Sequence, residues 1–307
     1  MIVRIIARLT IFTCIIFYDA CAKIRYTGNE KVVVTGQFES ANSFISYVTI
    51  DEHEYIIKQK KDSEKQIIAA MREALAAYIA RDLKIAQDVR ILQATDHTPG
   101  KKYQSHPATL HTLALGKEVS DMHGHKYFLL CLKQRDQNGK KITGKWLTEV
   151  IIDQITWHKH IAIMIALDIF LCNTDRNRRN LFYDEQSDSF CAIDMENIYR
   201  RNVAEMACKK LHEMIHVYHK KFTKQEVEAL LLVKNTLQFL SKKYPPQRII
   251  ARVDRYVALA GYVNDGSFLN NKITKKIERH KKMIVQSYDS VQKLMILLDD
   301  IINTFPQ

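Results

Sequence analysis

The stretch DIFLCNTDRNRRNLFYDEQSDSFCAIDMEN, residues 168–197, decides the fold that this sequence predicts. An apolar run that begins before residue 168 is long enough for a helix, and it ends here in a polar loop at 173–180. Two short apolar runs follow, separated by a polar turn at 184–189, which is the pattern of a β-hairpin. The second strand of a hairpin folds back along the first, so we expect Asp175 and Asp194 to lie near each other.

Three residues of this stretch, Asp175, Asn180 and Asp194, carry the chemistry that we expect. Phosphoryl transfer needs one carboxylate that orients or deprotonates the attacking hydroxyl, and oxygen ligands that hold Mg²⁺ on the phosphates. Mg²⁺ prefers carboxylate and carbonyl oxygens, which Asp194 and Asn180 supply. The spacing from Asp175 to Asn180 is the Asp-x-x-x-x-Asn spacing of kinase catalytic loops.

The motif NTDRxxxN at 173–180, followed by AID at 192–194, resembles the catalytic and metal-binding loops of atypical kinases. These are the phosphatidylinositol kinases, the HipA-type bacterial serine kinases and the related secretory-pathway kinases. The resemblance implies that Asp175 is the catalytic base, that Asn180 is a metal ligand, and that Asp194 is the principal Mg²⁺ ligand. Two positions depart from the pattern: Asn177 stands where many members have His, and Met-Glu-Asn follows Asp194 where many have Gly.

The front half of the chain offers the lysine that a kinase uses to pair the α- and β-phosphates of ATP. Residues 55–58 predict a strand, and alternation along it puts Ile56 and Lys58 on one face. Ile56 would then cover the adenine while Lys58 reaches the phosphates. Lys60 lies on the same face and is the alternative lysine.

Glu73 is the expected partner of that lysine, because a kinase also needs a helix glutamate to hold it. A capping-box pattern at 63–66 predicts a helix that runs to about Leu83. Burying an acid on a close-packed face is costly without a cation, which favours a pair with Lys58; the alternative is an exposed face with an ordinary surface acid. The other residues of that face are alanines: Ala69, Ala70, Ala76, Ala77 and Ala80.

The loop at 36–43 is a weaker candidate for nucleotide binding. Its backbone N–H groups and hydroxyls, Ser43 among them, would cap the phosphates. The loop matches no G-x-G-x-x-G pattern, and a plain hairpin loop explains it equally well.

Strand patterns gather at the front of the chain and helix patterns at the back. With the resemblance, this predicts an α+β, bilobal kinase-like fold: a small antiparallel-β N-lobe with one long helix at 23–135, and a larger, mostly α C-lobe at 136–307. The expected cleft lies between Lys58 with Glu73 and the loop residues of the C-lobe, and 132–135 would be its hinge. Residues 96–126 are expected to be mostly loop with short strands. Other predicted strands are 31–35, 44–50 and 127–132, and predicted helices are 146–170, 203–218, 224–243 and 272–304.

Composition excludes several classes of protein. The chain has 307 residues, 47% of them hydrophobic and 26% charged, which is typical of a globular protein. Six Cys without paired spacing argue against a disulfide mini-scaffold and a zinc ribbon. The formal net charge of +12 favours anionic partners. Nucleic acid is not favoured, because the basic residues are scattered and no recognition module is present.

The first 22 residues resemble a secretory signal peptide. Arg4 and Arg8 precede an apolar run at 9–17. The small residues at 20–22, Ala-Cys-Ala, then form a pattern like a signal-peptide cleavage site. The run is short for a membrane span, which needs about 20 apolar residues. This predicts cleavage after Ala22 and export or secretion; the alternative is a buried N-terminal element in a cytoplasmic protein.

Other polar residues have less specific interpretations. His212, His216 and His219 share one helical face, a spacing that permits zinc binding, although a solvated basic face is favoured. His106 and His111 are interpreted as loop residues. The basic residues of the catalytic loop would meet an acidic peptide or a lipid phosphate: Arg176, Arg178 and Arg179.

The resemblance implies an ATP-dependent phosphotransferase that uses Mg²⁺, with Mn²⁺ as a substitute. Its first choice of acceptor is a serine or threonine hydroxyl of a protein substrate. The alternative enzyme is a phosphoinositide kinase acting on a membrane lipid, which the basic surface favours. An alternative from another class is a nucleotide-binding pseudokinase that acts as a binding module.

Overall fold

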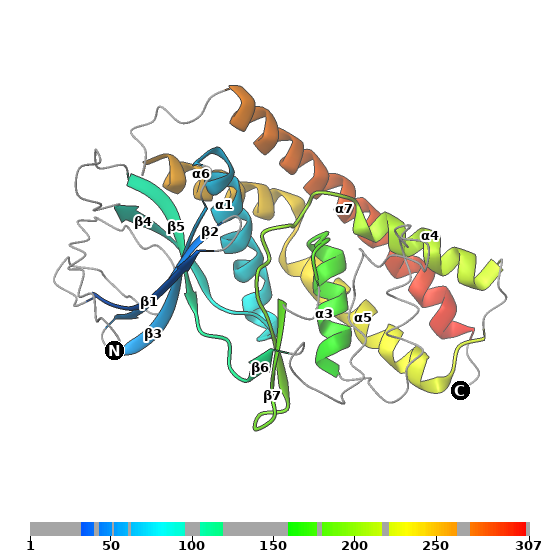
Figure 1. Cartoon of the computed structure of the whole chain (residues 1–307). Coiled ribbons are helices and arrows are strands. Elements are labelled where there is room, and N and C mark those ends of the chain that lie inside the picture. Colours follow the sequence, from blue (N-terminus) through cyan, green and yellow to red (C-terminus); the bar gives the residue numbers. More distant parts are fainter. Residues whose placement is uncertain are drawn as a thin grey trace, which may run out of the picture. The chain divides into compact units, whose positions relative to one another are not determined.

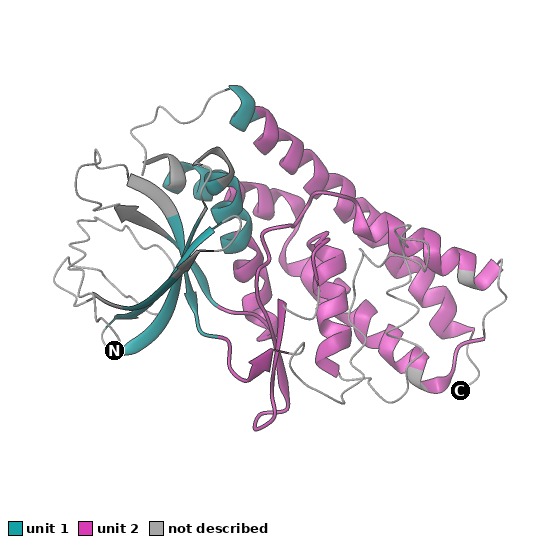
Figure 2. Cartoon of the chain, in the orientation of Figure 1, with its two compact units in different colours: residues 1–74, 88–113, 254–274 teal, residues 75–87, 114–253, 275–307 magenta. Residues whose placement is uncertain are grey.

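The computed structural model describes residues 32–39, 43–50, 52–60, 63–95, 105–118, 159–176, 180–216, 221–262 and 271–304. The chain divides into two compact units, coloured in Figure 2. Unit 1 is formed by residues 1–74, 88–113 and 254–274, and unit 2 by residues 75–87, 114–253 and 275–307. The predicted signal peptide, the predicted boundary at 135/136, the hinge at 132–135 and the strand at 127–132 all lie outside the described residues.

Unit 1 contains a five-stranded antiparallel sheet of order β1-β2-β3-β5-β4 (Figure 1). Its core consists of Val48, Ile50 and Leu110, with Tyr55 and Ile57 packed against them. The three predicted strands at the front of the chain are confirmed. The strands are β1 (Val32–Glu39), β2 (Ser43–Ile50), β3 (His53–Lys60), β4 (Val89–Thr95) and β5 (Ser105–Thr112).

The range 96–126 is expected to be mostly loop with short strands, and its described part contains the eight-residue strand β5. This strand pairs with β4 through residues 105–111 and with β3 through residues 109–112, so it lies inside the sheet. Its sequence, SHPATLHT, contains Pro and two His and therefore looks unlike a strand. Pairing on both sides overrides that weak local preference.

Helix α1 (Ser63–Ala80) and the short 3-10 helix that continues it, η1 (Arg81–Leu83), confirm the predicted helix. Both faces of α1 are buried. The alternative of an exposed alanine face is therefore excluded. Buried large residues are Ile67, Met71, Leu75 and Ile79, and buried alanines are Ala70, Ala74, Ala76, Ala77 and Ala80.

Unit 2 contains the predicted hairpin as β7 (Leu181–Asp184) and β8 (Ser189–Ala192), which pair antiparallel. A two-residue strand, β6 (Lys117–Glu118), completes the sheet in the order β6-β7-β8. Gly116 precedes β6 with φ +88°, and a Cβ there would lie 2.1 Å from the carbonyl oxygen of Tyr183. Only glycine permits this close approach.

Five helices of the back half are α3 (Lys159–Phe170), α4 (Val203–His216), α5 (Lys224–Lys243), α6 (Pro246–Tyr262) and α7 (Asn271–Asn303), shown in Figure 1. The predicted bounds of α5 are confirmed, and α7 differs by one residue at each end. Helix α5 begins with a capping box in which Thr223 and Glu226 bond each other's backbone N–H groups. Helix α6 is absent from the predicted set. The antiparallel front and helical back together confirm the predicted α+β fold class.

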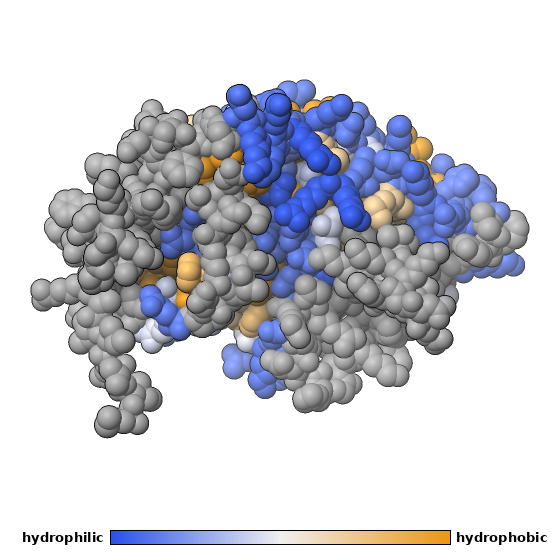
Figure 3. Space-filling view, turned by 45° about the horizontal axis from the view of Figure 1, so that its top comes forward, coloured by the Kyte–Doolittle hydropathy of each residue, from blue (hydrophilic) through white to orange (hydrophobic). Residues whose placement is uncertain are grey.

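The surface over α7 is strongly hydrophilic, as the blue face of Figure 3 shows. Exposed cations of this helix in unit 2 include Lys275, Lys276, Arg279 and Lys282. Within the described ranges, no helix combines the length and the apolar character that crossing a bilayer requires.

Candidate active site

Lys58 and Glu73 form the predicted ion pair within unit 1. The Nζ atom of Lys58, on β3, lies 2.7 Å from Oε1 of Glu73, on α1. The glutamate side chain is 3% exposed, whereas that of the lysine is 14% exposed. The pair therefore holds a buried carboxylate and a cation that solvent still reaches.

The second carboxylate oxygen of Glu73 has two partners on β5. Thr109 donates its hydroxyl to Oε2 at 2.9 Å, and Nε2 of His111 lies 3.3 Å from the same atom. The interpretation of His111 as a loop residue is therefore wrong. In the sheet Lys58 lies opposite Thr109, and alternation puts His111 on the same face as Thr109.

These neighbours keep Glu73 ionised. Burial by itself would raise the pKa of the carboxyl group. The charge of Lys58, the His111 ring and the hydrogen bonds from both outweigh that effect, so the pKa lies well below its ordinary value of 4.5. An ionised Glu73 is what an ion pair with Lys58 requires.

The two other predicted nucleotide contacts of unit 1 lie on the same sheet. Ile56 is half-buried on β3, and Ser43 is buried at the first position of β2. Residues 40–42 of the predicted phosphate loop and the side chain of Lys60 lie outside the described residues. The contacts of Ile56 and Ser43 with a nucleotide stay predictions.

In unit 2 the predicted catalytic loop is held by a buried ion pair between Arg176 and Asp168. Arg176 donates Nε to Oδ2 of Asp168 at 3.0 Å and Nη2 to Oδ1 at 3.1 Å, a bidentate arrangement. Its Nη1 donates to the backbone oxygens of Asn180, at 2.8 Å, and Ile193, at 3.2 Å. One side chain thus joins the end of α3, the predicted catalytic loop and the residue before Asp194.

The prediction that Arg176 meets an acidic peptide or a lipid phosphate is wrong. Its side chain is 2% exposed and its donors are used inside the protein. Asp168 was the available signal, because an acid within an apolar helix needs a buried cationic partner. Arg178 and Arg179 lie outside the described residues.

Asp175 is held from three sides. Its backbone N–H donates to Oδ1 of Asn173 at 3.1 Å, and its backbone oxygen accepts Nδ2 of Asn180 at 2.9 Å. Its carboxylate oxygen Oδ2 accepts Nδ2 of Asn197 at 2.7 Å. Two residues of the loop therefore hold the backbone of the predicted base, and Asn197, from the segment after β8, holds its carboxylate.

Asn180 is buried beside this base. Because its Nδ2 is used in the bond to Asp175, the side-chain atom that it can offer a cation is the carbonyl oxygen. Its backbone oxygen also accepts the N–H of Ile193, at 3.1 Å, which ties the loop to the segment after β8.

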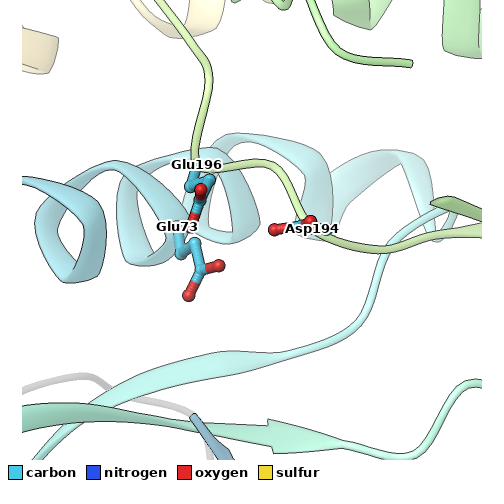
Figure 4. A group of neighbouring side chains, drawn as sticks. All are labelled: Glu73, Asp194 and Glu196. Carbon is cyan, nitrogen blue, oxygen red and sulfur yellow. The ribbon is translucent and has the colours of Figure 1, made fainter. Parts of the chain in front are cut away.

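The segment after β8 carries two carboxylates. A side-chain oxygen of Asp194 and one of Glu196 lie within 4.8 Å of each other. Figure 4 shows both on this segment, and Glu73 on α1. Asp194 has φ 52°, in the left-handed region that Asp tolerates better than most residues. Glu196 therefore offers a second carboxylate oxygen, two residues after the predicted ligand Asp194. It is not among the candidate ligands that the sequence predicts.

His212 and His216 are exposed on α4, and their ring centroids lie 4.2 Å apart. His219 lies outside the described residues. Exposure of the two described rings accords with the favoured interpretation of a solvated face.

No protein-family model matches the chain, and no curated protein matches it. The chain is similar to the solved structure of a Helicobacter pylori proinflammatory kinase, CtkA, with 13% identity and a TM-score of 0.47 over 91% of this chain and 98% of that one. It is also similar to spectinomycin phosphotransferase APH(9)-Ia, solved with ADP and spectinomycin, with 12% identity and a TM-score of 0.28 over 86% of this chain and 93% of that one. Both likenesses are distant.

Proposed function

We propose that the chain is an ATP-dependent phosphotransferase and, within that class, a protein serine/threonine kinase. The observation that carries the proposal is the loop of unit 2. Asp175 receives an amide hydrogen bond on its carboxylate, and the buried Arg176 ties its loop to the residue before Asp194. A solvated polar loop needs no such buried anchor, whereas a general base and a metal ligand must be held in place.

Asp175 is the base in this proposal. The O–H bond of the acceptor breaks, and its proton passes to the Asp175 carboxylate. The acceptor oxygen forms a bond to the γ-phosphorus of ATP. The bond from that phosphorus to the β–γ bridging oxygen breaks, and its electron pair leaves with ADP.

The residues of unit 2 fit a hard divalent cation. Asp194, Glu196 and the side-chain oxygen of Asn180 are the donors that Mg²⁺ and Mn²⁺ prefer. When bound, the cation would neutralise charge on the phosphates. Asp194 is the principal ligand in the proposal, and Asn180 is the second.

Unit 1 supplies the nucleotide contacts of the proposal. Lys58 pairs the α- and β-phosphates, and Glu73 holds its amine in place. Ile56 covers the adenine, and Ser43 caps a phosphate. The 14% exposure of the lysine side chain supports this role, because a fully enclosed amine would not reach a ligand.

A serine or threonine hydroxyl of a protein is the first choice of acceptor because of the resemblance to the atypical kinases. The phosphoinositide alternative keeps the basic surface and the NTDR wording of the loop in its favour. The buried Arg176 is bonded internally and meets neither acceptor, so its burial does not decide between them.

The test uses the purified full chain with γ-labelled ATP and either Mg²⁺ or Mn²⁺. Casein and phosphoinositide vesicles serve as acceptors in parallel. Asp175→Ala and Asp194→Asn are the site variants. Asp188→Asn is the matched control, because Asp188 is also an aspartate with positive φ, at 47°, but lies in the exposed hairpin turn.

Label on casein that both site variants lose and the control retains supports a protein kinase. Label on the phosphoinositide instead of casein indicates the alternative enzyme, a phosphoinositide kinase. A wild type that binds a fluorescent ATP analogue without turnover indicates the pseudokinase. A wild type that binds no nucleotide contradicts the proposal entirely.

A further inference from the structure

We infer that Asn197 is a positioning residue that holds the Asp175 carboxylate in the orientation needed to meet the acceptor hydroxyl. The inference rests on the proposed function, because the orientation of a base matters only if the loop transfers a phosphoryl group. Asn197 lies outside the catalytic loop, three residues after Asp194. It is one of the residues that depart from the pattern of the atypical kinases.

Asn197 contacts two consecutive residues of the catalytic loop. Its Nδ2 donates to Oδ2 of Asp175 at 2.7 Å. Its backbone oxygen accepts the N–H of Thr174 at 3.4 Å and the Thr174 hydroxyl at 3.5 Å. The short amide bond is the stronger contact, and the two longer ones keep the backbone of Asn197 beside the loop.

A second anchor lies two residues further along. The backbone N–H of Tyr199 donates to the backbone oxygen of Leu171 at 2.8 Å. Tyr199 is buried and has φ 50°, so the chain turns sharply where it meets the loop. The segment 197–199 is therefore docked along 171–175, and the backbone from which the Asn197 amide extends is held beside the loop.

The bond to Asp175 joins an amide donor on a buried residue to a carboxylate oxygen. Asn197 is 8% exposed. Hydrogen bonds to a charged group are shorter and stronger than neutral ones. The terminal torsion of an Asp side chain is broad, so it selects no orientation without an outside contact. The Asn197 amide provides that contact and adds no charge.

This arrangement links the two parts of the proposed chemistry. The segment that carries Asp194 also carries Asn197, so the position of the metal ligand and the orientation of the base depend on the same stretch of chain. Disturbing the segment would therefore affect both, whereas changing only the Asn197 side chain would affect the base alone.

The experiment compares Asn197→Ala, Asn197→Asp and Asn197→Gln in the full chain with γ-labelled ATP, Mg²⁺ and casein. We expect kcat to fall about 10- to 100-fold in Asn197→Ala, since small misplacement of a reacting group costs up to about 100-fold. KM for ATP and the affinity for a fluorescent ATP analogue should change less than about twofold, because the amide touches no nucleotide-binding residue of the proposal. Asn197→Gln retains the donor and should recover part of kcat.

Asn197→Asp has the same shape and should be at least as impaired as Asn197→Ala, because it sets one carboxylate against another. Combining Asn197→Ala with Asp175→Ala should lower kcat no further than Asp175→Ala alone, since the base that the amide positions is then gone. A full additional loss in the double variant would overturn the inference.

Asn202→Ala is the matched structural control. Its Nδ2 donates to Ser290 Oγ at 2.9 Å, and its Oδ1 accepts the N–H of Glu205 at the start of α4. We expect a lower melting temperature with an unchanged kcat. Wild-type turnover together with undiminished kcat in all three Asn197 variants would overturn the inference alone. Absence of wild-type turnover on any acceptor would overturn the proposed function and this inference with it.

Discussion

Each unit buries an acidic side chain on an apolar helix and pairs it with a cation, but the two pairs are built differently. In unit 1, Lys58 makes one short contact with Glu73 and keeps 14% of its side chain exposed. In unit 2, Arg176 is 2% exposed and makes four hydrogen bonds, two to Asp168 and two to backbone oxygens. The first cation can still serve a ligand, whereas the second has its donors used within the protein.

The choice of cation follows from this difference. The planar guanidinium of arginine presents five donors, which suits a junction of a helix end and two loop carbonyls. The lysine ammonium is a compact charge on a flexible stem, which suits a group that holds a carboxylate and, in the proposed function, also meets a phosphate. The sequence places each cation where its chemistry is useful.

The largest effect is expected from Arg176→Leu. It leaves the buried Asp168 without its cation and two loop carbonyls without their donor, so the free energy of unfolding should fall by about 3–5 kcal/mol. Urea unfolding followed by far-UV circular dichroism measures this. The control is Lys209→Ala, which removes an exposed pair with Glu205 and should leave the free energy of unfolding almost unchanged. A loss below about 1 kcal/mol for Arg176→Leu would refute its structural role.

Lys58→Met should cause the second-largest loss in the free energy of unfolding. The buried Glu73 loses its cation but keeps the hydroxyl of Thr109 and the ring of His111, so we expect a loss of about 2–3 kcal/mol. Phosphotransfer should be abolished in the same variant while Lys209→Ala remains active. If Lys58→Met lowered stability as much as Arg176→Leu, the contrast between the two pairs would disappear.

Thr109→Val tests the support that β5 gives to the unit 1 pair. The substitution keeps the shape of the side chain and removes the hydroxyl that donates to Glu73. The expected loss is about 1.5 kcal/mol, the lower end of the range for a hydrogen bond to a charged group. The comparison variant is Thr236→Val, because the hydroxyl of Thr236 bonds only a backbone oxygen of its own helix among the described contacts. Equal losses in both variants would argue against a special role for Thr109.

The last expected effect is a pH dependence of the free energy of unfolding that comes from unit 1. Because the pKa of Glu73 is lower when folded than its ordinary 4.5, its contribution to stability is complete above pH 4.5 and is lost as the pH falls below it. The slope from this one group is at most about 1.4 kcal/mol per pH unit. Urea unfolding between pH 3 and 6 should show a shallower acid limb for Glu73→Gln than for the wild type. Parallel acid limbs would contradict the assignment.

Patterns local in sequence predicted much of this molecule. The hairpin after the catalytic loop, the helix α5 and the helix that carries Glu73 each follow from periodicity and turn residues within a short window. The Lys58–Glu73 pair was also predictable, since a lone acid among alanines demands a nearby cation.

Features that depend on pairing between distant segments were not predictable in the same way. His111 looks like a loop residue until β5 is paired with β3, which depends on the whole sheet. The contact of Asn197 with Asp175 requires the segment after β8 to fold back on the catalytic loop, across 22 positions of sequence. No short-range pattern contains that geometry.

Two misses had visible signals. Asp168 stands in an apolar helix, so a buried cation such as Arg176 was to be expected. Helix α6 opens with Pro246 at a position where the missing N–H costs nothing, and apolar residues such as Ile249 and Val253 recur on one face behind it. The Pro245-Pro246 pair hides this start, because two prolines together suggest a loop.

The left-handed backbone at Asp194 has an evolutionary consequence. Aspartate, asparagine and glycine are the residues that adopt such a conformation most readily, and a single nucleotide change converts an aspartate codon into a codon for either of the other two. The loop could therefore lose its carboxylate and keep its shape in one mutational step. A lineage that carries this chain stands one substitution from a copy that keeps the shape of this loop but lacks the proposed cation ligand, and gene duplication would let both forms persist.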